Sequence, residues 1–502
     1  MSPPTSLPES PSASPSGRGS VGLPVTPRRI LITCGHVIGF RDGAHRHLRN
    51  GSVVVEGNRV AEVTGATVAG DFDQRVDCPE GLLTPGLIDM HAHMASAPYD
   101  RSFVEDVGKP GFYFSGLPEL LPALVAALDP EAERAAIDFS MAELTRSGTT
   151  TVFEIGGRGD DTAAAVERAG LRAWIGEGYG AAKWRTRDGR RMSFDWKPDG
   201  GLPGLEAARD FCARVHGRAG GRIHGQFTPM QVAMVTPELL ARTDAIAREM
   251  GLPVTLHTAE AVFEFHEMVQ REGCTPIEWL ARQGVLSERM ILGHTIFTSG
   301  NSWLNHPGRD LAILADSGAS VAHCAWVFAR RGIMMESFAR YRDAGVRMCL
   351  GSDTAPQSML QAMRSASILC KVADRDSRRA SAREVFDACT LAPAAVLGRD
   401  DLGRIAPGAM ADLLIWDTRG VSLAPLRDPL RNLVFSAQPE DLAHVMVDGD
   451  WLMTGGRLLK VDAAAASAGL QRAAERVWAR IGPGDWAGRG IDALSPPELA
   501  PW

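Results

Sequence analysis

Hydrophobic residues in the middle of the chain fall into short apolar runs that alternate with longer segments rich in Ala, Leu, Arg and Glu. Short apolar runs are typical of buried strands, and the longer segments have the length of helices. Eight such units between residues 81 and 404 predict an α/β fold of the (β/α)8 TIM-barrel type rather than an open sheet. The predicted strands are residues 87–91, 149–153, 173–176, 223–227, 253–257, 290–293, 320–322 and 346–350.

The two ends of the chain instead alternate apolar and polar residues between Gly-rich breaks. This period of two predicts short antiparallel strands. Because the same pattern occurs on both sides of the predicted barrel, we expect one small β-sandwich domain built from residues 27–80 and residues 405–460.

Two further segments flank these domains. Residues 1–26 are rich in Pro, Ser and Gly, which predicts a disordered tail. Residues 461–502 predict a helical extension with one apolar face, for which packing or subunit contact is the expected role. The residues of that face are Leu470, Ala473, Ala474, Val477 and Ile481.

Charge and cysteine content exclude several classes of partner. The chain has 53 Lys and Arg against 60 Asp and Glu, a formal net charge of −7, and no dense basic run. It also lacks a long uninterrupted apolar segment. We therefore expect no nucleic-acid and no membrane partner. The eight cysteines lack Cys-x-x-Cys spacing, which favours reduced thiols and a cytoplasmic location.

His91 and His93 end the first predicted strand of the barrel. Successive side chains of a strand alternate between its faces, so these two imidazoles point the same way. Two imidazoles on a rigid strand make half of a tetrahedral site for zinc, iron, cobalt or nickel. The alternative is a pair of unrelated histidines, because His-x-His is short enough to recur by chance.

Other residues of ligand type follow the later strands. His257 closes one strand with Glu260 shortly after it, His294 closes the next, and Asp353 follows the last. Any one of them alone is commonly a structural hydrogen-bonding group. In a barrel, however, the carboxyl ends of all strands meet at one mouth, so together they predict a metal site.

Such a site predicts hydrolysis. A divalent ion with an open coordination position lowers the pKa of bound water to about 7, which makes hydroxide available at neutral pH. Attack on an unsaturated carbon bound to nitrogen gives a tetrahedral adduct whose amine leaves only when protonated. We expect Glu260 to carry that proton, Asp353 to orient the hydroxide, and His294 to stabilise the developing negative charge.

With these residues assembled, the chain resembles the amidohydrolase superfamily, in the branch of aminotriazine chlorohydrolases and nucleobase-type deaminases. The resemblance covers residues 29–458. Its motifs are specific for the superfamily but less so for a substrate. They include Thr-Pro-Gly-Leu-Ile-Asp-Met-His-Ala-His ending at His93, Leu-His-Thr-Ala-Glu ending at Glu260, Gly-His ending at His294 and Gly-Ser-Asp ending at Asp353.

The resemblance implies one divalent metal ion, Zn²⁺ with Fe²⁺ or Co²⁺ as alternatives. Its implied ligands are His91, His93, His257 and Asp353. Binuclear members use a carbamylated lysine on the fourth strand, and residues 222–229 contain no lysine, so a single ion is expected. The resemblance also gives Glu260 the handling of protons and His294 the holding of the hydroxide, and it implies a homo-oligomer.

Three stretches depart from the deaminase pattern where substrate is bound. After the fourth strand, Pro-Met-Gln-Val-Ala replaces Pro-His-Ala-Pro-Tyr, so Met230 stands where a histidine touches the base. After the seventh strand, Cys-Ala-Trp-Val-Phe replaces Cys-Pro-x-Ser-Asn and introduces Trp326 and Phe328. After Asp353, Thr-Ala-Pro-Gln-Ser replaces a Gly and a downstream Ser-Asn. These losses of polar partners favour an apolar or aryl substrate, as in members that resemble phenylurea and thiocarbamate hydrolases.

His323 and Glu154 also end predicted strands and are candidate substrate-binding residues. For His323 we favour the alternative of a structural role, or of an orienting partner of the metal site. The alternative for Glu154 is a cap on the following helix.

These patterns predict a metal-dependent hydrolase that uses water to cleave a carbon–nitrogen bond, other than a peptide bond, in a small amide, urea or carbamate. The enzymatic alternative is a deaminase or dechlorinase of a nitrogen heterocycle of triazine, purine or pyrimidine type. A non-enzymatic scaffold would lack a ligand or Glu260, and the chain retains all of them.

Overall fold

The computed structural model describes residues 28–103, 108–113, 115–500 and 502. The tail predicted at residues 1–26 lies outside the described residues.

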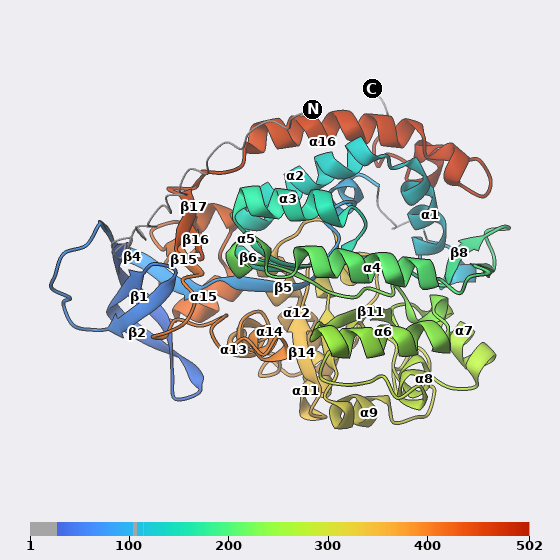
Figure 1. The fold of residues 1–502 in the computed structure, drawn as a ribbon, viewed down its shortest axis with the longest axis horizontal. Helices are drawn as coiled ribbons and strands as arrows, with labels where there is room; N and C mark the ends of the chain where they lie inside the picture. Colours follow the sequence, from blue (N-terminus) through green and yellow to red (C-terminus); the bar gives the residue numbers. More distant parts are fainter. Residues whose placement is uncertain (1–27, 104–107, 114, 501) are drawn as a thin grey trace, which may run out of the picture.

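Two four-stranded parallel sheets form the centre of the molecule (Figure 1). Their strand orders are β10-β7-β6-β5 and β11-β12-β13-β14. Isolated parallel bridges link the sheets at both edges, from Ala92 to Asp353 and from Phe227 to Val254. The α/β class and all eight predicted strands are confirmed. The strands are β5 (Leu87–Ala92), β6 (Thr149–Gly156), β7 (Arg172–Glu177), β10 (Ile223–Gly225), β11 (Val254–Thr258), β12 (Met290–His294), β13 (Ser320–His323) and β14 (Arg347–Leu350).

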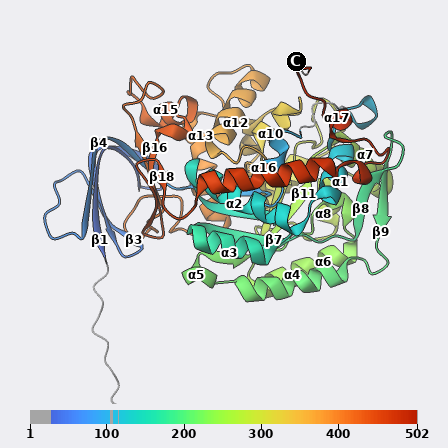
Figure 2. The same cartoon turned by 90° about the horizontal axis from the view of Figure 1, so that it is seen from above.

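Helices lie between these strands or follow the last of them in the chain, and they pack outside the sheets (Figures 1 and 2). They are α1 (Leu117–Ala127), α2 (Pro130–Arg146), α3 (Gly159–Ala169), α4 (Leu202–Val215), α5 (Arg218–Gly221), α6 (Pro237–Met250), α7 (Val262–Glu272), α8 (Pro276–Arg282), α9 (Asp310–Ser317), α10 (Ala325–Arg330), α11 (Phe338–Asp343), α12 (Met359–Asp374), α13 (Ala382–Asp387) and α14 (Leu391–Val396). A hairpin that the pattern did not predict, β8 (Ala182–Thr186) with β9 (Met192–Trp196), follows β7.

The predicted pairing of the two chain ends is observed, but as one continuous eight-stranded sheet of order β18-β17-β16-β15-β4-β1-β2-β3. Its middle pair joins the halves, because β4 runs antiparallel to β15. The strands are β1 (Arg29–Arg41), β2 (Ala44–Glu56), β3 (Arg59–Thr64), β4 (Gln74–Pro85), β15 (Leu413–Asp417), β16 (Leu442–Val447), β17 (Asp450–Thr454) and β18 (Arg457–Leu458). Helix α15 (Pro429–Phe435) lies between β15 and β16 in the chain.

A single residue joins this terminal sheet to the central sheets. β4 ends at Pro85, β5 begins at Leu87, and only Gly86 stands between them. The N–H of Gly86 donates to the carbonyl of Asp412 at 2.8 Å. A Cβ at Gly86 would overlap the Thr150 side chain, so no larger residue fits. The strand that carries His91 is thus a direct continuation of the terminal sheet.

The predicted C-terminal helix is α16 (Ala463–Ala479), which lies across α2 and α1 (Figure 2). The face predicted to be apolar is buried there with residues of α1 and α2. This contact supports the packing role for that face. A short helix, α17 (Ile491–Leu494), follows. Within the described residues, no helix combines the length and apolarity that a membrane crossing needs.

Candidate metal centre and active site

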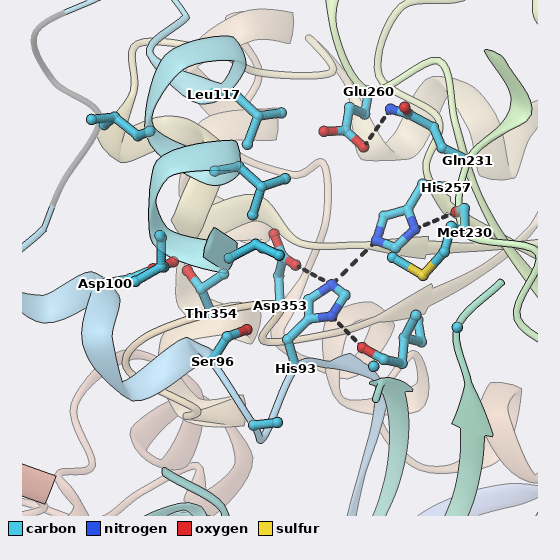
Figure 3. A pocket seen from close by; sticks show the side chains of 18 of the residues that line it. His93, Ser96, Asp100, Leu117, Met230, Gln231, His257, Glu260, Asp353 and Thr354 are labelled. Carbon is cyan, nitrogen blue, oxygen red and sulfur yellow. Dashed lines mark hydrogen bonds and ion pairs between the residues drawn. The ribbon is translucent and has the colours of Figure 1, made fainter. Parts of the chain in front are cut away.

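Side chains from the ends of three strands converge at one edge of the central sheets (Figure 3). Nε2 of His93 lies 3.2 Å from Nε2 of His257 and 3.3 Å from Oδ1 of Asp353. Nε2 of His91 lies 3.5 Å from the same carboxylate oxygen. The structure therefore brings the four predicted ligands together from three segments that are widely separated in the sequence.

Hydrogen bonds locate the protons on two of these rings. Nδ1 of His257 lies 2.6 Å from the carbonyl oxygen of Met230, and Nδ1 of His93 contacts that of Ile155. A carbonyl oxygen only accepts, so Nδ1 carries the proton in each ring and Nε2 of the neutral ring presents a lone pair. Two lone pairs and a carboxylate oxygen then face one another at close range, an arrangement that a cation stabilises.

The spacing of these atoms also fits a small divalent ion. Ligands about 2.0–2.1 Å from an ion at tetrahedral angles lie about 3.3–3.4 Å apart, and the observed separations are 3.2, 3.3 and 3.5 Å. Both ring nitrogens of His91 are buried and make no hydrogen bond to a described residue. An imidazole so placed has an unused lone pair, so the donor set fits a divalent ion.

Two glycines of the sequence motifs make room for His91. A Cβ at Gly293, before His294, would lie 2.6 Å from Cε1 of the His91 ring. A Cβ at Gly351, two residues before Asp353, would lie 2.6 Å from Cβ of His91. Since real Cβ atoms do not approach so closely, both positions require glycine for the ring to sit where it does.

The backbone around the site is strained. Several non-glycine residues that follow or end the strands have φ in the left-handed region, at a cost of about 1–3 kcal/mol each. They are Met230 (48°), Ala259 (54°), His294 (73°), Thr295 (47°) and Asp353 (62°). Such residues concentrate where a fold fixes side chains for function, and these five surround the converging imidazoles.

Burial and charge set the protonation of the ligands. Burial, with the charge of His93, lowers the pKa of His257 to about 4, and burial puts the pKa of His91 well below its usual value. Burial disfavours the charged form of His93 too, but its hydrogen bond and charge interaction with Asp353 raise its pKa to about 9. Without a cation Nε2 of His93 therefore also holds a proton at neutral pH, and a bound metal ion would displace that proton and use the lone pair. Burial likewise opposes ionisation of Asp353, yet the surrounding imidazoles hold its pKa well below its usual range. The carboxylate is therefore ionised, as a cation requires.

Asp89 ties two ligand-bearing segments together beneath the site. Its Oδ1 accepts from the backbone N–H of His91 at 3.2 Å and of Ser352 at 3.0 Å, and its Oδ2 accepts from the Ser352 hydroxyl at 2.5 Å. Burial raises the pKa of Asp89 to about 6. This carboxylate fixes β5 against the segment after β14, and so fixes His91 against Asp353.

Glu260 and His294 border the converging ligands. The ligand-type atoms of Glu260, His257 and His294 all lie within 4.8 Å of one another. Gln231 donates from Nε2 to Oε2 of Glu260 at 3.2 Å (Figure 3). The His294 ring lies 4.6 Å from that of His91 and, edge-on, 4.6 Å from that of Phe328. A carboxylate and an imidazole thus stand beside the site that a metal would occupy.

A cavity of about 480 Å³ opens above these groups. His93, His257, Glu260, His294 and Asp353 line one end of it. A largely apolar wall from α1 lines another part (Figure 3). The residues of this α1 wall are Leu117, Leu120, Leu121, Leu124 and Val125.

Of the five predicted substrate-binding residues, Met230, Phe328 and Glu154 line the cavity. Glu154 does not cap a following helix, because its Oε2 accepts from the N–H of Met94 at 2.6 Å. Burial raises the pKa of Glu154 to about 7. The position of these three side chains makes each available to a ligand.

His323 and Trp326 are not among the lining residues, so their positions do not support substrate contact. The His323 ring lies 6.5 Å from that of Phe338 in α11, and burial lowers its pKa to about 4. Trp326 stands two residues before Phe328 on α10. Positions two apart on a helix are about 200° apart around it, so Phe328 in the cavity directs Trp326 elsewhere.

Several lining residues had no signal in the sequence analysis. These residues reach the cavity through the tertiary placement of α1, the β8–β9 hairpin and the segments after β5 and α10. They include the α1 wall, Asp100, Lys183, Trp184 and Arg331. Gln231 and Thr354 had a weak signal, because they lie in the departing stretches after the fourth strand and after Asp353.

The sequence matches one protein family and is similar to two deaminases along most of its length. A family model described as "Amidohydrolase family" matches residues 82–452. The 5'-deoxyadenosine deaminase of Methanothermobacter thermautotrophicus is 31% identical over 415 residues, which cover 82% of this chain and 91% of that protein. A 5-methylthioadenosine/S-adenosylhomocysteine deaminase of Halobacterium salinarum is 30% identical and covers 83% of this chain and 91% of its own length.

Two solved structures are similar in fold. An adenosine deaminase from Xanthomonas campestris with bound zinc has a TM-score of 0.78 and 24% identity, covering 90% of this chain and 99% of its own. Atrazine chlorohydrolase from Arthrobacter aurescens TC1 complexed with zinc has a TM-score of 0.76 and 21% identity, covering 89% and 100%. The names of the sequence relatives fit the deaminase alternative better than amide or urea hydrolysis.

Proposed function

Because the chain belongs to the amidohydrolase family, we propose that its cavity is the active site of a mononuclear zinc enzyme that removes an amino group from a nitrogen heterocycle by hydrolysis. Family membership makes the protein a metal-dependent hydrolase of small molecules that acts on carbon–nitrogen bonds other than peptide bonds. The choice of deamination is supported by the relatives, whose names are those of nucleoside deaminases.

One observation carries the proposal. The ring nitrogens of His93 and His257 face each other and Oδ1 of Asp353 at 3.2 and 3.3 Å, in a cavity that Glu260 also lines. We assign the metal to these residues and His91. Zinc is supported by the zinc in two structural neighbours. We further propose that the two central sheets, linked at both edges, close into one (β/α)8 barrel.

The proposed reaction adds water across a carbon–nitrogen bond. The water oxygen bonds to the ring carbon, the bond from that carbon to the amino nitrogen breaks, and ammonia leaves. A divalent ion held by these ligands supplies Lewis-acid activation of water at neutral pH. Glu260 takes the proton that the water loses and gives it to the departing nitrogen, which needs it because an amide anion is too poor a leaving group.

His294 and Asp353 assist the same step in this proposal. Burial holds the pKa of His294 well below its usual value, so its ring is neutral and can donate one N–H to the oxygen as negative charge develops. Asp353 is ionised and accepts from the attacking water, which orients it. Met230, Phe328 and Glu154 line the space left for the substrate.

A second candidate function is hydrolysis of an aryl amide, urea or carbamate. The α1 wall, with Met230 and Phe328, supports it, because these side chains offer a base or ribose few hydrogen-bonding partners. The same proton transfer by Glu260 serves this reaction, with an amine rather than ammonia as the leaving group.

The test is a substrate screen on protein whose metal content has been measured. Purified protein is incubated with amino-substituted heterocycles, including adenine nucleosides and aminotriazines, and with aryl ureas and anilides, and ammonia and arylamine are measured. Ammonia from the first group supports deamination. Arylamine release with inert heterocycles would move the assignment to the second candidate, and inactivity of zinc-loaded protein on every compound would reject both.

A further inference from the structure

Gln231 lies beside the proposed proton carrier, Glu260, and has no role in the reaction as proposed above. It lies after β10 and pairs with β11 through a parallel bridge to His257. Its side chain lines the cavity, and the residue is 3% exposed. A glutamine is a costly residue to bury unless its amide is used, because a primary amide has two donors and an acceptor to satisfy.

The contact with Glu260 fixes which way the amide points. Nε2 of Gln231 lies 3.2 Å from Oε2 of Glu260 (Figure 3). An ionised carboxylate only accepts hydrogen bonds, so the nitrogen of the amide faces Glu260 and the carbonyl oxygen faces away. Gln231 therefore holds the carboxylate with one end of its amide and leaves the other end for a different partner.

That other end, Oε1, is buried and accepts no hydrogen bond from any described residue. Its chain neighbour Met230 carries a thioether, which cannot donate. The Nδ1–H of nearby His257 is committed to the carbonyl of Met230. A buried acceptor without a donor is unfavourable. A bound molecule that donates an N–H to Oε1 therefore makes a hydrogen bond that no described residue makes.

We propose that Gln231 selects substrates whose leaving nitrogen carries an N–H. In this arrangement, which rests on the proposed function, Oε1 accepts that N–H while Nε2 holds Glu260. With its N–H directed at Gln231, the departing nitrogen turns its lone pair toward the neighbouring carboxyl group, where the proton arrives. Gln231 is thus a positioning and specificity residue for either candidate reaction, and it disfavours chloride and fully substituted amines as leaving groups.

The decisive test compares leaving groups on one parent compound. Wild-type enzyme is assayed with a heterocycle or aroyl compound, taken from the successful screen, that carries a methylamino, a dimethylamino or a chloro leaving group. We expect kcat/KM for the methylamino compound to exceed that for the dimethylamino compound by about 10²-fold or more, because a site built for a hydrogen bond rejects an analogue that lacks it. Values within about threefold would overturn the proposal.

A size-matched variant separates hydrogen bonding from steric exclusion. Gln231→Met keeps the length of the side chain and removes both polar atoms. We expect kcat/KM for the methylamino compound to fall about 10²-fold and the ratio between the two amines to shrink below about tenfold, with metal content unchanged. A ratio that persists in the variant would show that bulk, not Oε1, excludes the dimethylamino group, and would overturn the proposal.

Two controls complete the design. Gln471→Met makes the same chemical change on an exposed face of α16 and should leave both the rates and their ratio unchanged. If Gln231→Met fails to fold or to retain metal, Gln231→Leu takes its place in the same comparison, and a wild-type ratio within about threefold still overturns the proposal. Failure of the proposed function has a separate signature, since wild-type enzyme would then hydrolyse no carbon–nitrogen substrate at all.

Discussion

The cavity has two sides that differ in polarity and in the way the chain builds them. The strand-end side is polar, comes from residues scattered over the central sheets, and is held by short hydrogen bonds such as that of His257 to Met230. The α1 wall is apolar, comes from one continuous helix, and offers no fixed polar contact. In the proposed function, the first side determines which bond is broken, and the second determines which molecules bind.

Removing a ligand should have the largest effect of any change to the strand-end side. His93→Ala is expected to abolish stoichiometric zinc and to lower kcat/KM by about 10³-fold or more, because the Lewis acid contributes several kcal/mol to the transition state. Elemental analysis and initial rates measure both quantities. His266→Ala, on the exposed face of α7, is the matched control and should retain zinc and activity. Full activity of metal-free His93→Ala would refute the assigned centre.

Replacing the proposed proton carrier, Glu260, should have the next largest effect and should leave the metal in place. Glu260→Gln is expected to lower kcat by about 10²–10⁴-fold, the usual contribution of a positioned acid or base. Zinc content should stay at the wild-type level, since Glu260 is not an assigned ligand. Glu249 is exposed on α6, so Glu249→Gln is the matched control and should leave kcat and zinc content unchanged. Unchanged turnover in Glu260→Gln would mean that another group moves the proton.

A polar residue in the α1 wall should change selectivity and leave the chemistry intact. Leu121→Asn places an amide among the leucines, which is expected to raise KM for apolar substrates about tenfold and to change kcat less than threefold. Leu121 is half-buried, so the fold tolerates the change better than at a core position. Steady-state kinetics with an apolar and a polar substrate measure the effect. A loss confined to kcat would mean that α1 acts on the chemistry, and the distinction between the two sides would fail.

The smallest effect on activity is expected at His323, which ends β13 but is not among the residues that line the cavity. Its pKa is about 4 in the folded protein against about 6.5 unfolded, so the unfolded state binds more protons between these values. The free energy of unfolding therefore falls as pH drops from 6.5 to 4, by up to about 1.4 kcal/mol per pH unit. His323→Asn should flatten this slope.

Denaturant unfolding at pH 7 and pH 4.5 measures the slope, and kcat/KM at pH 7.5 should stay within about threefold of wild type in His323→Asn. A large loss of kcat/KM, with folding and zinc intact, would show that His323 serves the reaction after all.

The same two sides explain what could be predicted from the sequence. The positions of His91, His93, His257 and Asp353 could be predicted because each stands at the end of an apolar run, and parallel strands bring their ends together by topology alone. The glycines at 293 and 351 strengthened the motifs, and the structure gives their reason in the space that the His91 ring needs.

The α1 wall could not be predicted, because leucines at helical spacing have the same pattern whether they pack in a core or line a cavity. The sequence also could not show which of Trp326 and Phe328 lines the cavity. Both stood in a stretch where substrate contact was expected, and the short helix α10 directs only one of them to the cavity. The terminal sheet was predicted from its period of two, but alternation alone does not distinguish two packed sheets from one continuous sheet.

The single glycine between β4 and β5 leaves no hinge between the terminal sheet and the strand that carries His91. A metal ion held by His91 would therefore also stabilise the terminal sheet, because the two are joined through one residue. Metal binding is then expected to raise the stability of strands from both ends of the chain. By the same linkage, substitutions that destabilise the terminal sheet are expected to weaken metal affinity.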